Sequence, residues 1–258
     1  MIKKSSFTLP FFVSCTYLFL YLPAIILVLY SFNKSGTSGA WTGFSTEWYH
    51  ELFDSQEIWE CFSNSLIIAL VSSILAVMLS ISLVHNVGYF SSKITYLFYA
   101  NICIPDVVLS VGMLILFSYF FVPLGFVTLI VGHTVLILGF IVPIIQARYQ
   151  ELDYRLIEAS YDLGASRLFT FFHVVIPFLM PAIIVSFLLG IIVSFDDFLI
   201  TFFCAGSAIQ TLSLYIFAMV RTGISPVVNA LSTLMLLVNV LLVLLISWLT
   251  YRMEKKYV

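Results

Sequence analysis

The feature that most limits the fold of this chain is a series of long apolar stretches, each near the roughly 20 residues that a helix needs to cross a membrane. Each is much longer than a transmembrane β-strand of about ten residues, and none alternates steadily between apolar and polar residues. With 62% hydrophobic and 9% charged residues, the chain has too little polar surface for a soluble fold. We therefore predict an all-α polytopic membrane protein with six transmembrane helices, at residues 10–32, 65–84, 94–120, 125–145, 176–203 and 229–250.

The distribution of basic residues predicts the orientation of these helices, because Lys and Arg in short loops stay on the cytoplasmic side. Under a six-span topology, Lys34 and Arg221 lie on one side of the membrane. The other nine of the 11 basic residues share the opposite side, and they are Lys3, Lys4, Lys93, Arg148, Arg155, Arg167, Arg252, Lys255 and Lys256. Both termini are therefore expected in the cytoplasm, and the acidic segment 33–64 is expected outside.

The remaining general features favour a single membrane domain over residues 1–258. The first apolar stretch follows two lysines, as in a secretory signal peptide, but it is too long for one, so we expect a retained helix. The four cysteines form no metal-binding or redox pattern. We expect no catalytic residue, no bound metal and no nucleic-acid partner.

The connection between the fourth and fifth apolar stretches, residues 147–175, is long for a cytoplasmic loop and predicts ordered structure. Apolar residues recur in it at helical spacing while charged residues occupy other faces, which indicates an amphipathic helix. The apolar residues are Leu152, Leu156, Ala159 and Leu163, and the charged ones are Arg155, Glu158 and Asp162. We predict cytoplasmic coupling helices at about residues 151–172, and the alternative is that residues 147–175 only form a connector lying on the bilayer surface.

A tight turn is expected to follow this helix. Gly164 stands where a helix would end in a left-handed C-cap, and Ser166 can then cap a second short helix that runs through Phe172. Pro177 and Pro181 open the fifth stretch, where a missing N–H group costs least. The predicted order is helix, tight turn, helix and then membrane.

The same residues resemble the EAA loop of ABC importer permeases, which reads E-A-A, three residues, G, nine residues, I-x-L-P. Ser160, Val174 and Ile176 depart from it by small changes of volume. The resemblance implies a type I ABC importer (MetI-like) permease fold, whose coupling helix docks in a groove of a separate ATPase. It assigns ATPase coupling to Glu158, Ala159, Ser160, Gly164, Ile176 and Pro177.

A partner ATPase is also expected from the residues themselves. An apolar helix face outside the membrane needs a partner protein, and a groove is the simplest site for it. The chain contains no G-x-x-x-x-G-K-[ST] phosphate loop. We therefore expect a non-catalytic subunit without a cofactor of its own, with ATP and Mg²⁺ bound by the ATPase.

The second half of the chain resembles the permeases of polyamine importers, specifically those of spermidine/putrescine ABC systems. The matching segments are 104–108, 194–198 and 213–230, whereas 203–211 departs most from the pattern. The resemblance implies polyamine import across the bacterial cytoplasmic (inner) membrane by alternating access. It also implies a second homologous permease subunit, an ATPase dimer and an extracytoplasmic polyamine-binding protein as partners, with the lipid bilayer around the subunit.

Three acidic residues within the predicted spans, Asp106, Asp196 and Asp197, suit a cationic cargo. A carboxylate inside a membrane costs roughly 2.5 to 3.5 kcal/mol unless it faces a cavity or a partner. Ser186, Gly190, Ser194, Asp197 and Thr201 share one helical stripe, which should face protein or pore. We interpret the three aspartates as substrate-pathway residues, with Asp197 the better placed, and add Trp48 and Tyr215 for cation–π contact.

Structural alternatives stand beside this interpretation. Asp196 or Asp197 could pair with Arg221, and Asp106 could bond a backbone group freed by Pro105. His133 could belong to a proton relay, although a hydrogen bond between helices is the simpler explanation.

Two rival functions also remain. An ABC permease for ferric iron, sugar or another small solute would share the loop and differ in the pocket. An ion-coupled secondary transporter would show inverted repeats and broken helices in matching halves, and neither is visible.

Overall fold

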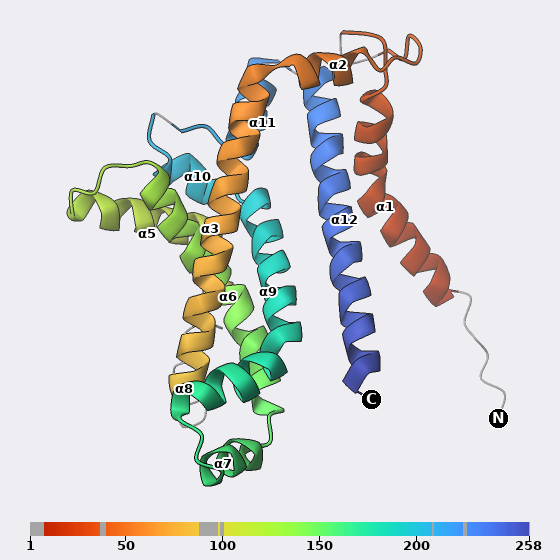
Figure 1. Cartoon of the computed structure of the whole chain (residues 1–258). Helices are drawn as coiled ribbons and strands as arrows, with labels where there is room; N and C mark the ends of the chain where they lie inside the picture. Colours follow the sequence, from red (N-terminus) through yellow and green to blue (C-terminus); the bar gives the residue numbers. More distant parts are fainter. Residues whose placement is uncertain are drawn as a thin grey trace, which may run out of the picture. The chain divides into compact units, whose positions relative to one another are not determined.

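The computed structural model describes residues 8–36, 40–87, 98, 101–207, 209–223 and 226–257. The described chain is almost entirely helical (Figure 1), which confirms the predicted all-α class. Its elements are α1 (Thr8–Tyr30), α2 (Glu47–Asp54), α3 (Gln56–Val87), α5 (Asp106–Tyr119), α6 (Phe126–Gln150), α7 (Tyr154–Asp162), α8 (Arg167–Thr170), the π-helix η1 (Phe171–Val175), α9 (Ile176–Asp196), α10 (Leu199–Cys204), α11 (Leu212–Thr222) and α12 (Pro226–Tyr257).

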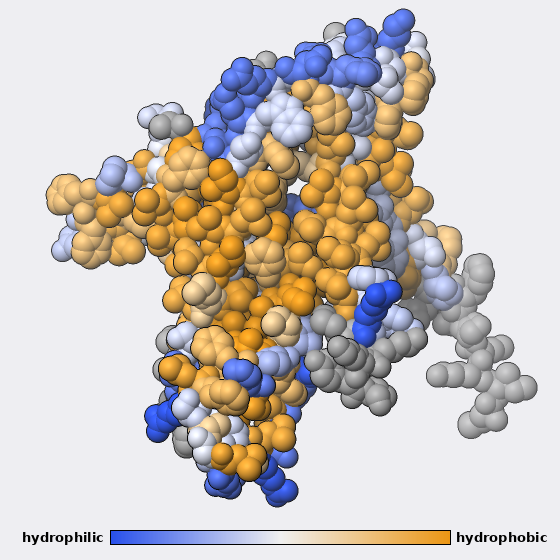
Figure 2. All heavy atoms as spheres, in the orientation of Figure 1, coloured by the Kyte–Doolittle hydropathy of each residue, from blue (hydrophilic) through white to orange (hydrophobic). Residues whose placement is uncertain are grey.

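Five helical segments in the described residues are long and apolar enough to cross a membrane. They are Pro10–Tyr30, Gln56–Asn86, Phe126–Gln150, Arg167–Asp196 and Pro226–Arg252. The third predicted span, 94–120, corresponds to α5, a shorter apolar helix that begins directly after Pro105. Its predicted residues 94–97 and 99–100 lie outside the described residues. On the viewed face, apolar side chains cover the long helices, and hydrophilic side chains gather around α2 and around α7 (Figure 2).

The chain divides into two compact units, and each is described by itself. The first comprises residues 1–59 and 216–238. In the connection between α1 and α2, the Asn33 side chain donates to the Ala40 carbonyl at 2.8 Å and accepts from the Thr42 N–H at 3.0 Å. The Trp48 indole N–H donates to the Asn33 carbonyl at 2.7 Å. Hydrogen bonds therefore join the described residues on both sides of this loop and link them to α2.

The second unit comprises residues 60–215 and 239–258, and it contains two clusters of buried apolar side chains. The first cluster joins α3, α6 and α9 around Ile137, Ile141, Ile145 and Leu179, which have no exposed surface. The second cluster joins α5, α6 and α10 around Leu129 and Ile200. α6 therefore runs through both clusters.

The predicted fifth span, 176–203, is divided into two helices. α9 ends at Asp196, Asp197 adopts an extended conformation, and α10 begins at Leu199. The predicted polar stripe of this segment faces protein, because Ser186, Ser194 and Thr201 are buried. At the interruption, the Asp197 carboxylate accepts from the Thr201 N–H in place of a helical partner, and His133 of α6 bonds the Ser194 and Thr201 hydroxyls.

Candidate transport pathway and coupling site

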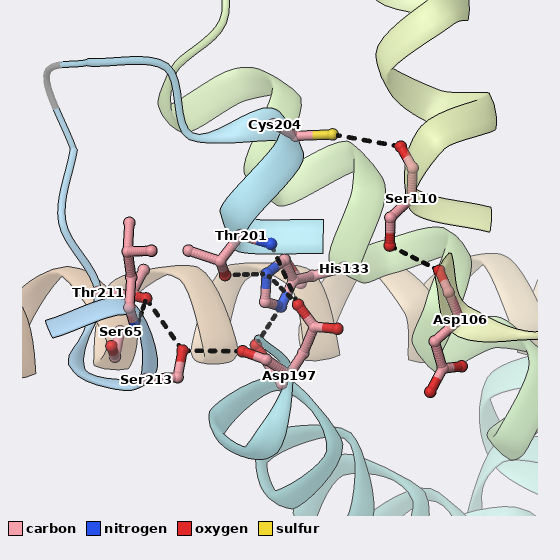
Figure 3. Close-up of polar contacts among 12 residues, drawn as sticks. Ser65, Asp106, Ser110, His133, Asp197, Thr201, Cys204, Thr211 and Ser213 are labelled. Atoms are coloured by element: carbon pink, nitrogen blue, oxygen red, sulfur yellow. Dashed lines mark hydrogen bonds and ion pairs between the residues drawn. The ribbon is translucent and has the colours of Figure 1, made fainter. Parts of the chain in front are cut away.

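A cluster of polar side chains surrounds the break between α9 and α10 (Figure 3). His133 of α6 lies at its centre and is 2% exposed. Its Nδ1 is 2.8 Å from Ser194 Oγ at the end of α9, and its Nε2 is 3.3 Å from Thr201 Oγ1 in α10. The interpretation of His133 as a hydrogen bond between helices is therefore confirmed.

Asp197 is held at the same point, with its side chain only 6% exposed. Its Oδ2 accepts a hydrogen bond from the Thr201 backbone N–H at 3.2 Å and lies 3.7 Å from His133 Nε2. Its backbone carbonyl accepts from the Ser213 hydroxyl at 2.8 Å. An N–H in the first turn of a helix has no partner within the helix, so the carboxylate stabilises the start of α10.

Asp196, the preceding residue, is exposed at the end of α9. Its Oδ1 accepts from the Asn239 amide of α12 at 2.7 Å. The extended backbone at Asp197 separates the two adjacent carboxylates, because it ends the helix between them. We expected Asp197 to be the better placed for a cargo, but in this structure Asp196 is the more accessible of the two.

Asp106 is the first residue of α5 and is also exposed. Its backbone carbonyl accepts from the Ser110 hydroxyl at 2.7 Å. Within the part of the chain that the structure describes, its carboxylate accepts no hydrogen bond, so the expected alternative of a backbone group freed by Pro105 is not observed. An exposed carboxylate at the start of an apolar helix is available to a cation.

The two aromatic residues expected on the pathway lie in different units. Tyr215 follows Ser213 by two residues on α11 in the second unit, and is half-buried. Trp48 belongs to the first unit, where its indole N–H bonds the Asn33 carbonyl. Arg221, the expected alternative partner of Asp196 or Asp197, also lies in the first unit, with its guanidinium carbon 5.8 Å from the Phe217 ring centroid. Their roles toward a cargo stay predictions.

Three members of the polar cluster were not singled out from the sequence as partners of the aspartates. They are His133, Ser213 and Asn239, which contact Asp197 or Asp196 from α6, α11 and α12. A usable signal was present, because a polar side chain inside a membrane usually pairs with another. The sequence did not indicate which polar residues of different helices would meet.

The predicted coupling loop forms α7, a tight turn and α8. The Gly164 N–H donates to the Tyr161 carbonyl at 2.8 Å, and the Ala165 N–H donates to the Ser160 carbonyl at 3.1 Å. This pair of bonds is a Schellman motif, and its left-handed residue is Gly164 with φ +84°. The predicted C-cap is confirmed.

The second helix begins as predicted, since the Ser166 side chain accepts from the Phe169 N–H. The two short helices are also linked by a hydrogen bond between Ser160 Oγ and Thr170 Oγ1, at 2.8 Å. α8 continues through η1 into α9, where Ile176 is half-buried and Pro177 is exposed in the first turn. A rigid element thus precedes the fifth span directly.

Large apolar side chains are exposed on the surface of this element. Leu163 is 89% exposed and Leu168 is 72% exposed, and Glu158 and Ala159 are exposed beside them. An open groove of about 770 Å³ lies against the turn. Its lining residues are Leu156, Ala159, Ser160, Leu163, Gly164, Ala165, Ser166, Phe169 and Val174. The predicted apolar face of α7 is therefore available to another molecule.

Solved structures of similar fold come from ABC transporters. A bacterial alginate ABC transporter in complex with an alginate pentasaccharide-bound periplasmic protein contains a chain that superposes with a TM-score of 0.69 at 16% identity, covering 96% of this chain and 95% of that one. A bacterial ABC transporter involved in the import of the acidic polysaccharide alginate gives a TM-score of 0.65 at 16% identity, over 95% and 94%. At this identity the likeness shows the fold alone, and it supports the predicted permease fold.

Relatives of higher identity include the spermidine/putrescine transport system permease protein PotC of Escherichia coli K12, 33% identical over 237 residues and 90% of each chain. The PotC protein of Haemophilus influenzae is 33% identical over 93% of this chain and 95% of its own. The putrescine transport system permease protein PotI of Escherichia coli K12 is 35% identical over 84% and 82%. Residues 72–257 match the family described as binding-protein-dependent transport system inner membrane component. The chain belongs to this family, as its coupling loop predicted.

Proposed function

We propose that this chain is the permease subunit of an ATP-driven importer that carries polyamines across the inner membrane. The observation that carries the proposal is its 33% identity over 90% of the chain to a spermidine/putrescine permease. The accessible carboxylates of Asp106 and Asp196 agree with a cationic cargo, because an ammonium group offsets the cost of a carboxylate at membrane depth. A permease for sugar or ferric iron would need a different pocket.

The coupling loop supports an ATP-driven mechanism. The exposed apolar residues of α7 and α8 suit a helix-in-groove contact with a cytoplasmic ATPase, to which Glu158, Ala159 and Gly164 would contribute docking geometry. The Schellman turn and the Ser160–Thr170 bond keep the two short helices together. Because α8, η1 and α9 are continuous, a displacement of the loop would be transmitted to α9 and to the polar cluster at its end.

The assembly would place this chain beside a second permease subunit of the same fold, above an ATPase dimer that binds ATP and Mg²⁺. A soluble extracytoplasmic protein would deliver the cargo. Both termini would lie in the cytoplasm, as the distribution of basic residues indicates. Asp106, Asp196 and Asp197 would attract the ammonium groups of the cargo, and Trp48 and Tyr215 would add cation–π contacts of about 0.5 to 2 kcal/mol.

The test is an ATPase and uptake assay of the complex purified with this chain and reconstituted in lipid. Its ATPase should be stimulated by a binding protein loaded with spermidine or putrescine. Stimulation only by a protein loaded with sugar or iron would contradict the proposed cargo. Uptake without ATP would contradict the proposed class.

Removing the charge of the pathway carboxylates should weaken uptake. D106N and D196N, which alter the two exposed carboxylates, are each expected to raise the KM for polyamine about tenfold, which corresponds to about 1.4 kcal/mol. D54N removes an exposed carboxylate of α2 and serves as the matched control, with wild-type KM expected. An unchanged KM in both variants would contradict the proposal that these carboxylates attract the cargo.

A further inference from the structure

His133 is the side chain through which α6 holds the break between α9 and α10. Its two ring nitrogens contact the last turn of α9 through Ser194 and the third residue of α10 through Thr201. Both hydroxyls can donate or accept, so a neutral imidazole satisfies them together. The nearby Asp197 carboxylate favours the tautomer with the N–H at Nε2, and in that tautomer Nδ1 accepts a hydrogen bond from the Ser194 hydroxyl.

The neighbouring residues of α6 hold α10 at the same level. The Thr128 hydroxyl donates to the Cys204 carbonyl at 2.8 Å. Gly132 is so close to α10 that a Cβ there would lie 2.6 Å from Ile200 Cγ2. α6 therefore fixes α10 by a close backbone approach and by side-chain bonds at two levels.

The break sets adjacent aspartates in opposite environments. Asp197 is turned into the protein against His133 and the start of α10, whereas Asp196 is left exposed at the end of α9 (Figure 3 shows Asp197 and His133). In a continuous helix the two side chains would be about 100° apart around one axis. The accessible position of Asp196 thus depends on how the break is held.

We propose that His133 is a positioning residue of the cation pathway, which holds the α9–α10 break by neutral hydrogen bonds so that Asp196 faces the cargo and Asp197 stays buried. This inference rests on the proposed function. The clamp consists of His133 with Ser194, Thr201 and Asp197. His133 does not touch the cargo itself.

The first experiment separates positioning from stability by kinetics of the reconstituted complex. H133F fills a similar volume without hydrogen bonds and should raise the KM for spermidine about tenfold while the maximal rate of assembled complex changes less than about twofold. H133Q can both donate and accept, so it should restore the KM to within about threefold of wild type. T201V removes one hydroxyl of the clamp and is the milder variant, so the KM for spermidine should rise about threefold.

T134V is the matched control, because the Thr134 hydroxyl bonds only within α6, to the Ile130 carbonyl, and is buried next to His133. It should leave the KM unchanged. If H133F and T201V assemble with wild-type KM, or if they lower the rate alone, His133 is not a positioning residue. An equal rise in KM in T134V and T201V would also overturn the inference.

The second experiment does not depend on the cargo. In a chain whose exposed Cys15 and Cys103 are replaced by Ser, D196C should react with a cationic methanethiosulfonate reagent at least about tenfold faster than D197C. Adding H133A to D197C should raise its rate toward that of D196C. Equal rates without H133A would overturn the inference, even if polyamine stimulation is found. Unequal rates without any response to polyamines would leave the clamp intact and contradict the proposed function.

Discussion

Two interruptions of helices in the second unit are closed in different ways. At the α9–α10 break, the Asp197 carboxylate caps the Thr201 N–H four residues away, and His133 of α6 adds side-chain bonds to residues 61 and 68 positions away in the sequence. At the α7–α8 turn, the hydrogen bonds come from Tyr161 and Ser160, within five residues of the groups they bond. The His133 and Asp197 side chains at the first interruption are 2% and 6% exposed, whereas Leu163 beside the second is 89% exposed.

Because of this difference, the two interruptions should be sensitive to different substitutions. The break depends on volume and polar complementarity between distant segments, so a change in α6 should affect it. The turn depends on one left-handed residue, and its exposed apolar side chains stay available for a partner. Variants that alter volume or backbone conformation should therefore act on one interruption and not on the other.

The largest effect is expected from G132A in α6. A Cβ at this position would lie 2.6 Å from Ile200 Cγ2, so the Ile200 side chain or α10 must shift, at a cost of about 1 to 3 kcal/mol. The thermal unfolding temperature of the complex in lipid nanodiscs should fall, and the thiol reactivity of D197C should rise. Wild-type stability of G132A would show that α10 is not held closely by α6.

A double-mutant cycle sharpens this test. I200A removes the contacted methyl group and is destabilising by itself, because Ile200 is fully buried. If the contact is the cause, G132A and I200A together should cost at least about 1 kcal/mol less than the sum of the single variants. If the losses of stability are additive instead, the two residues act independently and their contact is not the cause.

A smaller and more local effect is expected from G164A at the turn. Nothing lies within 4 Å of a Cβ there, but the φ of +84° strains an alanine by about 1 to 2 kcal/mol. Because the turn is exposed, the strain should open it locally, lowering transport per ATP hydrolysed while the unfolding temperature changes little. G112A is the control, since Gly112 of α5 also has open space but no positive φ. Equal effects of both variants would show that backbone conformation is not the cause.

The α7–α8 turn was predictable because its determinants are local. Gly164 and Ser166 are residue types with strong preferences for the C-cap and the N-cap, and both act on backbone groups within five residues. The helical spans were likewise readable from runs of apolar residues. Such signals need no knowledge of which distant segments meet.

The break at Asp197 was not predictable in the same way. The stretch 176–203 is apolar enough to be one helix, and the residue that favours its interruption, His133, lies in another span. Hydropathy gives the same expectation for a broken and an unbroken segment. For the same reason the sequence could not show that Asp196 is exposed while Asp197 is buried.

The smallest effect is expected from S160A, which restores the second alanine of the EAA pattern. It removes the bond from Ser160 to the buried Thr170 hydroxyl and should cost about 0.5 to 1.5 kcal/mol of local stability. Amide hydrogen exchange of Gly164 and Ala165 should therefore quicken several-fold. T170V should do the same, and the double variant should add little, since either change removes the one bond. Full additivity would mean that the hydroxyls act separately, and that the turn is closed by its backbone alone.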